Sequence, residues 1–331
     1  MKGPVNSLRG LVIHRQDGFT LIELLVALAI STVIALAAVS SLVISRQGFT
    51  AVDAASQLRD NARFAVDTIQ RLGVQAGYKD VIYATTVRQS SVIGVASNPN
   101  PDVTGFNNAV VSATDPENAA TARITADGSD ILILRYQQSE TFPGSGVSEG
   151  TMIDCLGASS TSTIAINRDD RVTSVLHVNS GATTIDGEPS LMCTRVGSAN
   201  PTQPLIRGVE NFQVLYGIDG GAGSALDFLA DRFLRADQII VTGDPIATNA
   251  NWRRVRSIRI GMVLRGPPGS AINQTAQTFY PLGSGQDSAT GAIGSAMSSA
   301  NDTGTIFAPT PDGRLRQAVT FTVHLRNELG L

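Results

Sequence analysis

Residues 18–45 read GFTLIELLVALAISTVIALAAVSSLVIS and determine how the rest of the chain is organised. The segment from Leu24 to Ser45 has 22 residues and no formal charge. As a helix it would rise about 33 Å at roughly 1.5 Å per residue, which is enough to cross one bilayer. A buried core helix is the alternative, but such helices are usually shorter, and no second stretch of this kind occurs. We therefore expect one membrane-spanning helix.

The charges before this helix predict its orientation. Residues 1–18 carry Lys2, Arg9 and Arg15 against Asp17, a balance of +3 − 1 = +2. Positively charged flanks of membrane helices stay in the cytoplasm. We therefore expect a single pass through the inner membrane, with the N-terminus in the cytoplasm and the residues after the helix exported to the periplasm.

The position of Gly18 distinguishes this segment from an ordinary secretory signal, which is cut after its apolar core. A cut after Gly18 would remove the basic leader and keep the apolar helix. Glu23 then places a carboxylate at the edge of that helix, and an ionised side chain at a helix centre costs about 2.5 to 3.5 kcal/mol. The new α-amino group of Phe19, from the same chain or a neighbouring copy, would neutralise it and gain roughly 4 kcal/mol before desolvation. We predict that Glu23 is an assembly residue.

Together, Gly18, Phe19 and Glu23 resemble the processing motif of type IV pilins and pseudopilins. The resemblance implies that a prepilin peptidase cuts after Gly18 and that Phe19 becomes an N-methylated N-terminus. It also implies that Glu23 guides insertion into a filament. A plain single-pass anchor in which the glutamate occurs by chance is the alternative.

The helical pattern continues beyond Gly48. Apolar residues recur at helical spacing at Ala54, Ala55, Leu58, Ala62, Ala65, Val66, Ile69 and Leu72. The opposite face carries Arg63, Asp67 and Arg71, and glycines at 73 and 77 are typical stop signals. This pattern predicts one helix from about residue 19 to residue 72, with Gly48 as a possible bend.

The remaining residues favour strands and loops. Predicted strands are Ile131–Tyr136, Val172–Val178, Phe212–Ile218, Gln238–Thr242, Val255–Leu264 and Ala318–Leu325. Period-two alternation in the last two predicts one buried and one wet face. Predicted loops are 94–128, 217–223 and 283–304. The expected fold class is α+β, a long N-terminal helix against an antiparallel β-sheet domain with long loops.

We divide the chain into four predicted parts. They are a leader (1–18), a transmembrane and assembly helix (19–45), a helix continuation that packs on the globular domain (46–77), and an exported β-rich pilin domain (78–331). No internal boundary is evident after residue 80.

Three segments, 208–219, 252–264 and 316–327, resemble the PilW family of minor pilins. This resemblance implies a subunit that initiates or caps a type IV pilus used for adhesion, twitching motility or DNA uptake. The implied partners are the prepilin peptidase, other minor pilins, the major pilin and a tip adhesin. A type II secretion pseudopilin of the J class shares the leader and helix but is usually shorter, and it is the alternative.

Cys155 and Cys193 are the only cysteines, and both lie on the side expected to be oxidising. A disulfide would close a loop of 39 residues and stabilise the fold by roughly 3 to 4 kcal/mol. Two free buried thiols are the alternative. A zinc site is not predicted, because two cysteines without nearby histidines cannot supply four ligands.

No catalytic set or cofactor site is predicted. The histidines are His14, in the leader, His177, and His324, which we place on the polar face of a strand. No nucleophile elbow, zinc-protease or phosphate-binding motif occurs. Asp219 and Asp227 flank a glycine-rich loop that could hold calcium, but EF-hand spacing is absent and turn chemistry explains the same residues.

Two other function classes stay open. An exported enzyme on a pilin-like anchor has no motif in its favour. A binding module whose loops grip an adhesin, a surface or DNA would use the basic residues Arg253, Arg254, Arg256 and Arg259. Alternation along a strand would split these arginines between two faces, and a net charge of −3 is unlike that of a general nucleic-acid binder. Nucleic acid is therefore not a predicted partner.

Overall fold

The computed structural model of the chain describes residues 18–79, 98, 100–122, 128–143, 145–159, 170–179, 186–197, 199, 201–220, 226–271, 275–283 and 302–327. Two compact units make up the chain, Met1–Thr50 and Ala51–Leu331. Of the predicted leader, only Gly18 lies within the described residues. Most of the predicted loop at 283–304 also lies outside them.

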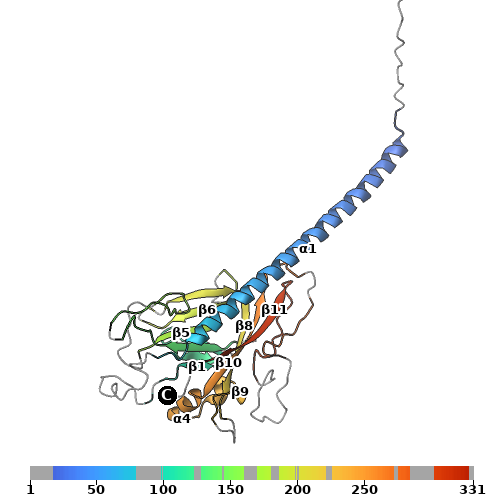
Figure 1. Ribbon diagram of the computed structural model, residues 1–331. Helices are drawn as coiled ribbons and strands as arrows, with labels where there is room; N and C mark the ends of the chain where they lie inside the picture. Colours follow the sequence, from blue (N-terminus) through green and yellow to red (C-terminus); the bar gives the residue numbers. More distant parts are fainter. Residues whose placement is uncertain are drawn as a thin grey trace, which may run out of the picture. The chain divides into compact units, whose positions relative to one another are not determined.

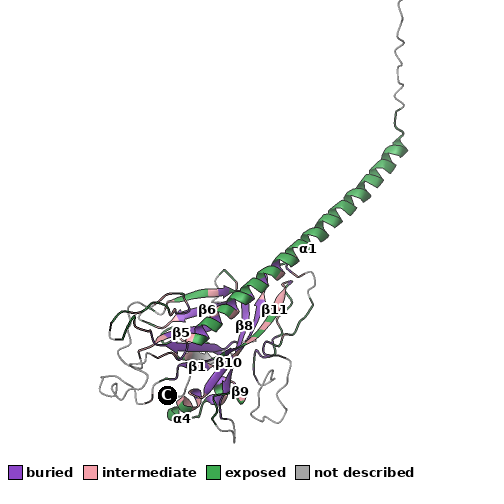
Figure 2. Cartoon of the chain, in the orientation of Figure 1, coloured by how far each residue is buried: buried purple, intermediate pink, exposed green. Residues whose placement is uncertain are grey.

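Helix α1 comprises Leu21–Gln75, so the helix predicted from residue 19 to residue 72 is confirmed with small shifts at both ends. Gly48 lies within the helix. In the first unit, every residue of α1 from Leu21 to Thr50 is exposed (Figure 2).

In the second unit, α1 buries one face. The buried residues are Ala54, Leu58, Ala62, Ala65, Ile69, Leu72 and Gly73. Their three- and four-residue spacing is that of an amphipathic helix, and six of the seven belong to the predicted apolar stripe. The predicted charged face at Arg63, Asp67 and Arg71 is exposed. This half of the helix therefore belongs to the core of the globular unit.

Gly73 is not the helix stop that we predict from sequence. It lies inside α1, where an added Cβ would come within 2.6 Å of Val323 Cγ1, so glycine permits a close approach to the sheet. The helix ends at Gln75, and Gly77 follows with a φ of 75°. The Gly77 N–H donates a hydrogen bond to the carbonyl of Arg135 at 2.9 Å, which ties the end of α1 to a strand.

The globular unit contains a five-stranded antiparallel sheet with strand order β1-β4-β5-β6-β7 (Figure 1). Its strands are β1 (Val103–Phe106), β4 (Ile131–Tyr136), β5 (Val172–Asn179), β6 (Ser190–Arg195) and β7 (Thr202–Arg207). The register aligns Leu132, Leu176 and Cys193 across three strands. These side chains share one face of the sheet and belong to the main core.

A four-stranded antiparallel sheet has the order β11-β10-β8-β9. Its strands are β8 (Val209–Ile218), β9 (Arg232–Leu234), β10 (Val255–Arg265) and β11 (Arg316–His324). Two short helices, α3 (Ala236–Ile239) and α4 (Pro245–Trp252), connect β9 to β10. A separate pair is formed by β2 (Ala109–Val111) and β3 (Ala119–Ala122).

The main core joins α1 to both larger sheets (Figure 2). It includes Ile69 from the helix, Leu176 from one sheet and Phe212 from the other. The rings of Tyr216 and Trp252 meet edge to face, with centroids 4.7 Å apart. Burial raises the pKa of Tyr216 well above its ordinary value. The predicted α+β fold is confirmed.

The predicted strand at Gln238–Thr242 is wrong. Helix α3 covers part of it, because Ala236 and Ile239 are both buried at a three-residue spacing. Ile240 and Val241, which favour strands by composition, are 46% and 40% exposed. The burial of Ala236 and Ile239 on one side of a helical turn thus outweighs the strand propensity of the local sequence.

The predicted wet face of β10 is also wrong, since only Arg259 and Arg265 in this strand are not fully buried. β10 lies between β8 and β11, and its residues are buried on both faces of the sheet. β11 lies at the edge of the sheet and does alternate, and His324 is exposed there as predicted.

Several short strands lie outside the predicted ones. β1, β2 and β3 fall within the segment 94–128, which we predict as a loop. β6, β7 and β9 were not predicted either, and β7 contains Pro204, which is typical of an edge strand.

Candidate assembly site

A capping box between Thr20 and Glu23 closes the first turn of α1. Thr20 Oγ1 accepts a hydrogen bond from the Glu23 N–H at 3.3 Å. Glu23 Oε2 accepts hydrogen bonds from the Thr20 N–H and from Thr20 Oγ1, both at 2.9 Å. These bonds satisfy N–H groups that the start of a helix leaves without intrahelical partners. In the chain that still carries its leader, the Glu23 carboxylate is therefore held by its own helix.

The predicted processing residues directly precede this cap. Phe19 is 87% exposed, and a Cβ placed on Gly18 would have no atom within 4 Å. Gly18, Phe19 and Glu23 thus lie together at the start of α1, where the residues that the structure describes leave Phe19 exposed and Gly18 without close neighbours. Our sequence reasoning missed Thr20, although the spacing Thr-x-x-Glu before an apolar run is the signal for a capping box.

The apolar part of α1 follows immediately. The helix contains an 18-residue window with a mean hydropathy of 2.5, and 0% of that window is buried. By length and composition it is a candidate membrane span. Large side chains such as Leu25, Ile30 and Val33 are more than half exposed. This surface has no covering partner among the described residues of the chain.

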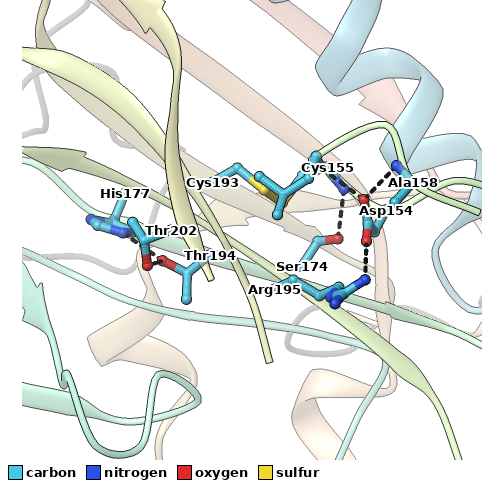
Figure 3. Close-up of a disulfide and its surroundings, with 10 residues drawn as sticks. Asp154, Cys155, Ala158, Ser174, His177, Cys193, Thr194, Arg195 and Thr202 are labelled. Carbon is cyan, nitrogen blue, oxygen red and sulfur yellow. Dashed lines mark hydrogen bonds and ion pairs between the residues drawn. A yellow bond between two sulfur atoms is a disulfide. The ribbon is translucent and has the colours of Figure 1, made fainter. Parts of the chain in front are cut away.

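A disulfide joins Cys155 to Cys193 on β6, with Cα atoms 5.8 Å apart (Figure 3). Both residues are at most 3% exposed. The Cys155 N–H also donates to Ser174 Oγ on β5 at 3.1 Å. Two residues before Cys155, the Ile153 N–H donates a hydrogen bond to Gln75 Oε1 on α1 at 3.0 Å. The bridge and these bonds hold one loop against both the five-stranded sheet and the end of the helix.

Asp154 and His177 also have structural partners around this bridge (Figure 3). Asp154 Oδ1 accepts the N–H groups of Leu156 and Ala158 at 2.9 and 3.0 Å, which forms the turn after the cysteine. His177 Nε2 lies 3.0 Å from Thr194 Oγ1, in a buried position between strands. These contacts account for both residues as parts of the fold.

Asp219 is fully buried and organises the turn after β8. Its two carboxylate oxygens accept the N–H groups of Asp227 and Phe228 at 3.2 and 3.1 Å. The Arg256 Nε lies 3.1 Å from Asp219 Oδ2. The acid that we considered as a calcium ligand therefore has turn and ion-pair partners, in line with turn chemistry.

Three of the four arginines of the predicted basic cluster, Arg253, Arg254 and Arg256, bind groups within the globular unit. Arg256 pairs with Asp219, and Arg254 Nε donates to the Asp219 carbonyl at 2.8 Å. Arg253 Nη2 donates to Asn98 Oδ1 at 3.4 Å. These guanidinium groups stabilise the ends of β8 and β10 and are not presented as a basic surface.

Two family models match the chain. The prokaryotic N-terminal methylation motif matches residues 13–39, and the type IV pilus-assembly protein W model, PilW, matches residues 175–327. Among solved structures, a type IV-like pilin from Thermus thermophilus is 16% identical, with a TM-score of 0.36. The match covers 82% of this chain and 97% of the Thermus chain. No curated protein matches the chain.

The match to the methylation motif and the apolar helix that leads into an α+β unit are features that the chain shares with the type IV pilin class. The chain matches the PilW family within that class, over a region that contains all three segments on which we based the resemblance. The predicted resemblance to PilW is confirmed.

Proposed function

We propose that this chain is a minor pilin of a type IV pilus that assembles with other minor pilins to initiate or cap the filament. A prepilin peptidase cuts it after Gly18, and Phe19 is then N-methylated. The observation that carries this proposal is the methylation motif at residues 13–39, which includes Gly18, Phe19 and Glu23 and continues into an exposed apolar helix.

Before cleavage, the chain lies in the inner membrane with its leader in the cytoplasm and its globular unit in the periplasm. The segment 19–45 spans the bilayer, and 46–77 continues it onto the exported domain at 78–331. On assembly, the apolar surface of the first segment exchanges lipid for the helices of neighbouring subunits. The globular unit then becomes part of the extracellular filament.

Cleavage changes the partners available to Glu23. The uncut chain satisfies the carboxylate with neutral donors from Thr20. The cut creates a charged amine on Phe19, four residues before Glu23, and each neighbouring copy supplies another. A pair of unit charges about 4 Å apart gains roughly 4 kcal/mol at an effective dielectric of 20, less the cost of desolvation. The amine of a neighbouring subunit therefore competes with Thr20 for the Glu23 carboxylate. The pairing of this amine with Glu23 fixes how far one helix is shifted along the next.

The partners that this role implies are the prepilin peptidase, other minor pilins, the major pilin and an adhesin at the tip. The filament serves adhesion, twitching motility or DNA uptake. We propose a structural role without catalysis, because the PilW match is to a pilus-assembly family.

Replacing Gly18 tests the cleavage step. Gly18→Trp introduces a bulky residue at the cut, and we expect the full-length precursor to accumulate in the membrane, as measured by intact-protein mass spectrometry. Gly48→Trp is the matched control, because Gly48 also has no atom within 4 Å of an added Cβ and lies outside the motif at residues 13–39. Removal of the leader from Gly18→Trp at the normal rate contradicts the proposal.

Replacing Glu23 tests the assembly step separately. Glu23→Gln removes the charge but keeps an oxygen that can accept from the Thr20 N–H, whereas Glu23→Ala removes both. We expect both variants to be cut normally and both to be lost from purified filaments. If Glu23→Gln enters filaments as well as the unaltered chain, the carboxylate charge has no role in assembly.

The type II secretion pseudopilin of the J class is distinguished by its partners. Affinity purification of the full chain from native membranes, after mild crosslinking, should recover other pilus minor subunits. Recovery of secretion-system subunits in their place favours the alternative.

A further inference from the structure

A pocket of about 510 Å³ lies in the globular unit, where residues of β1, β4 and α4 line it. Arg135 lines it, and the carbonyl of Arg135 accepts the hydrogen bond from Gly77, two residues after the helix. Ala54, near the beginning of the buried part of α1, instead lies close to Gly266. Ala54 and Ala76 are 22 residues apart, or about 33 Å along a helix.

Arg135 offers a fixed donor to this pocket. The residue is only 3% exposed, and its Nε donates to Glu117 Oε1 at 2.6 Å. Its Nη1 donates to the Pro101 carbonyl at 2.7 Å and to Thr104 Oγ1 at 3.0 Å. The remaining nitrogen, Nη2, has no acceptor among the residues that the structure describes. A ligand in the pocket thus meets a guanidinium that is already oriented and that has one donor group left.

The pocket also offers acceptors, and its charge excludes anions. The carboxylates of Asp115, Glu117 and Asp244 line it together with Arg135, a formal balance of 1 − 3 = −2. All three are held in place. Glu117 is bound by Arg135, Asp115 by Asn118 Nδ2 at 2.7 Å, and Asp244 by its position as the N-cap of α4. A negatively charged ligand would meet net repulsion here.

Apolar groups form another part of the wall. Phe106, Val241 and Trp252 line the pocket, and the ring of Tyr216 packs edge to face against the Trp252 ring. Asn249 on α4 adds an amide to this side. The ligand must therefore combine an apolar C–H surface with groups that can both donate and accept hydrogen bonds. Hydroxyl groups have that double capacity, whereas carboxylates, phosphates and ammonium groups do not.

We propose that this pocket binds a neutral saccharide, whose hydroxyls accept from Arg135 and donate to the flanking carboxylates while its ring packs against Trp252 and Phe106. The volume is within the range of small-molecule sites, about 300 to 1,000 Å³. This inference does not depend on cleavage or assembly. A neutral peptide is the competing ligand, because amides also carry both donors and acceptors.

The test is ligand-observed saturation-transfer NMR on the full chain, purified in lauryldimethylamine oxide, a detergent without a sugar headgroup. The probes are glucose, galactose, mannose and N-acetylglucosamine, with N-acetylglycinamide as the peptide analogue. We expect at least one sugar to show saturable transfer, with a Kd of about 1 mM or lower. Absence of transfer from all four sugars overturns the proposal, and so does transfer from the peptide analogue alone.

Variants on α4 locate the binding. Asn249→Ala removes an amide from the pocket lining and should raise the Kd for the sugar by about tenfold. Asn249→Trp should fill the pocket and prevent binding. Ile246→Ala is the matched control, because Ile246 is on the same helix, 69% exposed, and outside the lining. Thermal unfolding followed by circular dichroism verifies that each variant is folded, because Asn249→Trp adds a second tryptophan beside Trp252. Unchanged sugar binding in both folded Asn249 variants overturns the assignment to this pocket.

Discussion

The two halves of α1 have the same secondary structure and opposite surroundings. From Leu21 to Thr50 every residue is exposed, whereas from Ala51 to Gln75 one face is buried against the sheets. The second half has an apolar face and a charged face, but the first half carries no charge on any side from Leu24 to Ser45. A helix that is apolar on every side needs a surrounding of lipid or other helices. The comparison shows that periodicity, rather than apolar content, indicates which half belongs to the globular core.

The difference predicts separate consequences for substitutions in the two halves. Ile69 is fully buried, so Ile69→Ala should lower the free energy of unfolding of the globular unit by about 2 to 5 kcal/mol. Ile34→Ala, at a residue that is 63% exposed, is the matched control and should leave this value unchanged. Urea unfolding of the full chain in detergent, followed by the single tryptophan, Trp252, measures both. Equal losses for the two variants would contradict the division of the helix.

The disulfide should stabilise only the globular unit, Ala51–Leu331. Replacing Cys155 and Cys193 together by alanine should cost roughly 3 to 4 kcal/mol, because the bridge closes a long loop in the unfolded chain. Prepilin cleavage should continue at its normal rate, since Gly18 lies in the other unit. Urea unfolding and mass spectrometry of the N-terminus measure the two effects. A cleavage defect as large as the stability defect would show that the regions are coupled.

The free energy of unfolding of the globular unit should also depend on pH through Asp130. Burial, with a smaller contribution from the nearby Asp302, raises the pKa of Asp130 well above 3.8. The folded state therefore keeps the proton to higher pH than the unfolded state does. The stability from this group is present below the unfolded pKa and is lost as the pH rises toward the folded pKa.

Asp130→Asn removes this titration while keeping a side chain of similar size. The free energy of unfolding of the unaltered chain minus that of the variant should fall as the pH rises from about 4 to about 7. Urea unfolding at several pH values measures the difference. A difference that stays constant or increases with pH would rule out a raised pKa at this position.

The smallest predicted effect concerns the cap of α1. Thr20→Val removes the hydroxyl that accepts from the Glu23 N–H, and loss of an N-cap costs about 1 kcal/mol. This loss should remain local, with faster hydrogen exchange at the first amides of α1 and no change in urea unfolding of the globular unit. Thr20→Ser, which retains the hydroxyl, should restore protection. Equal exchange in both variants would show that the cap does not hold this turn.

Sequence patterns were most informative where a segment has one dominant environment. The apolar run after Glu23 and the buried stripe through Leu58 and Ile69 both predicted α1 within a few residues of its ends. β4 was predicted from its apolar run and β10 from its alternation, and both strands are buried along most of their length. The two wet-face predictions differ in outcome because both faces of β10 are buried, whereas β11 keeps one face exposed. A single strand sequence does not reveal what covers each face.

The parts that were missed depend on contacts between distant residues. β6 and β7 are recognisable only once they pair with β5 and with each other. α3 was missed because Ala236 and Ile239 find cover that the local sequence does not predict. At the assembly site, Gly18, Phe19 and Glu23 could be found from a local motif. The pocket around Arg135 could not, because its walls come from segments more than 100 residues apart.

The most direct test of the account is the N-terminus of this chain in purified native filaments, determined by mass spectrometry of the intact protein and its first peptide. The account predicts that the chain begins at Phe19 and carries an added methyl group on its amine. A filament-incorporated chain that still begins at Met1 would contradict it, because the uncut protein has no free amine beside Glu23.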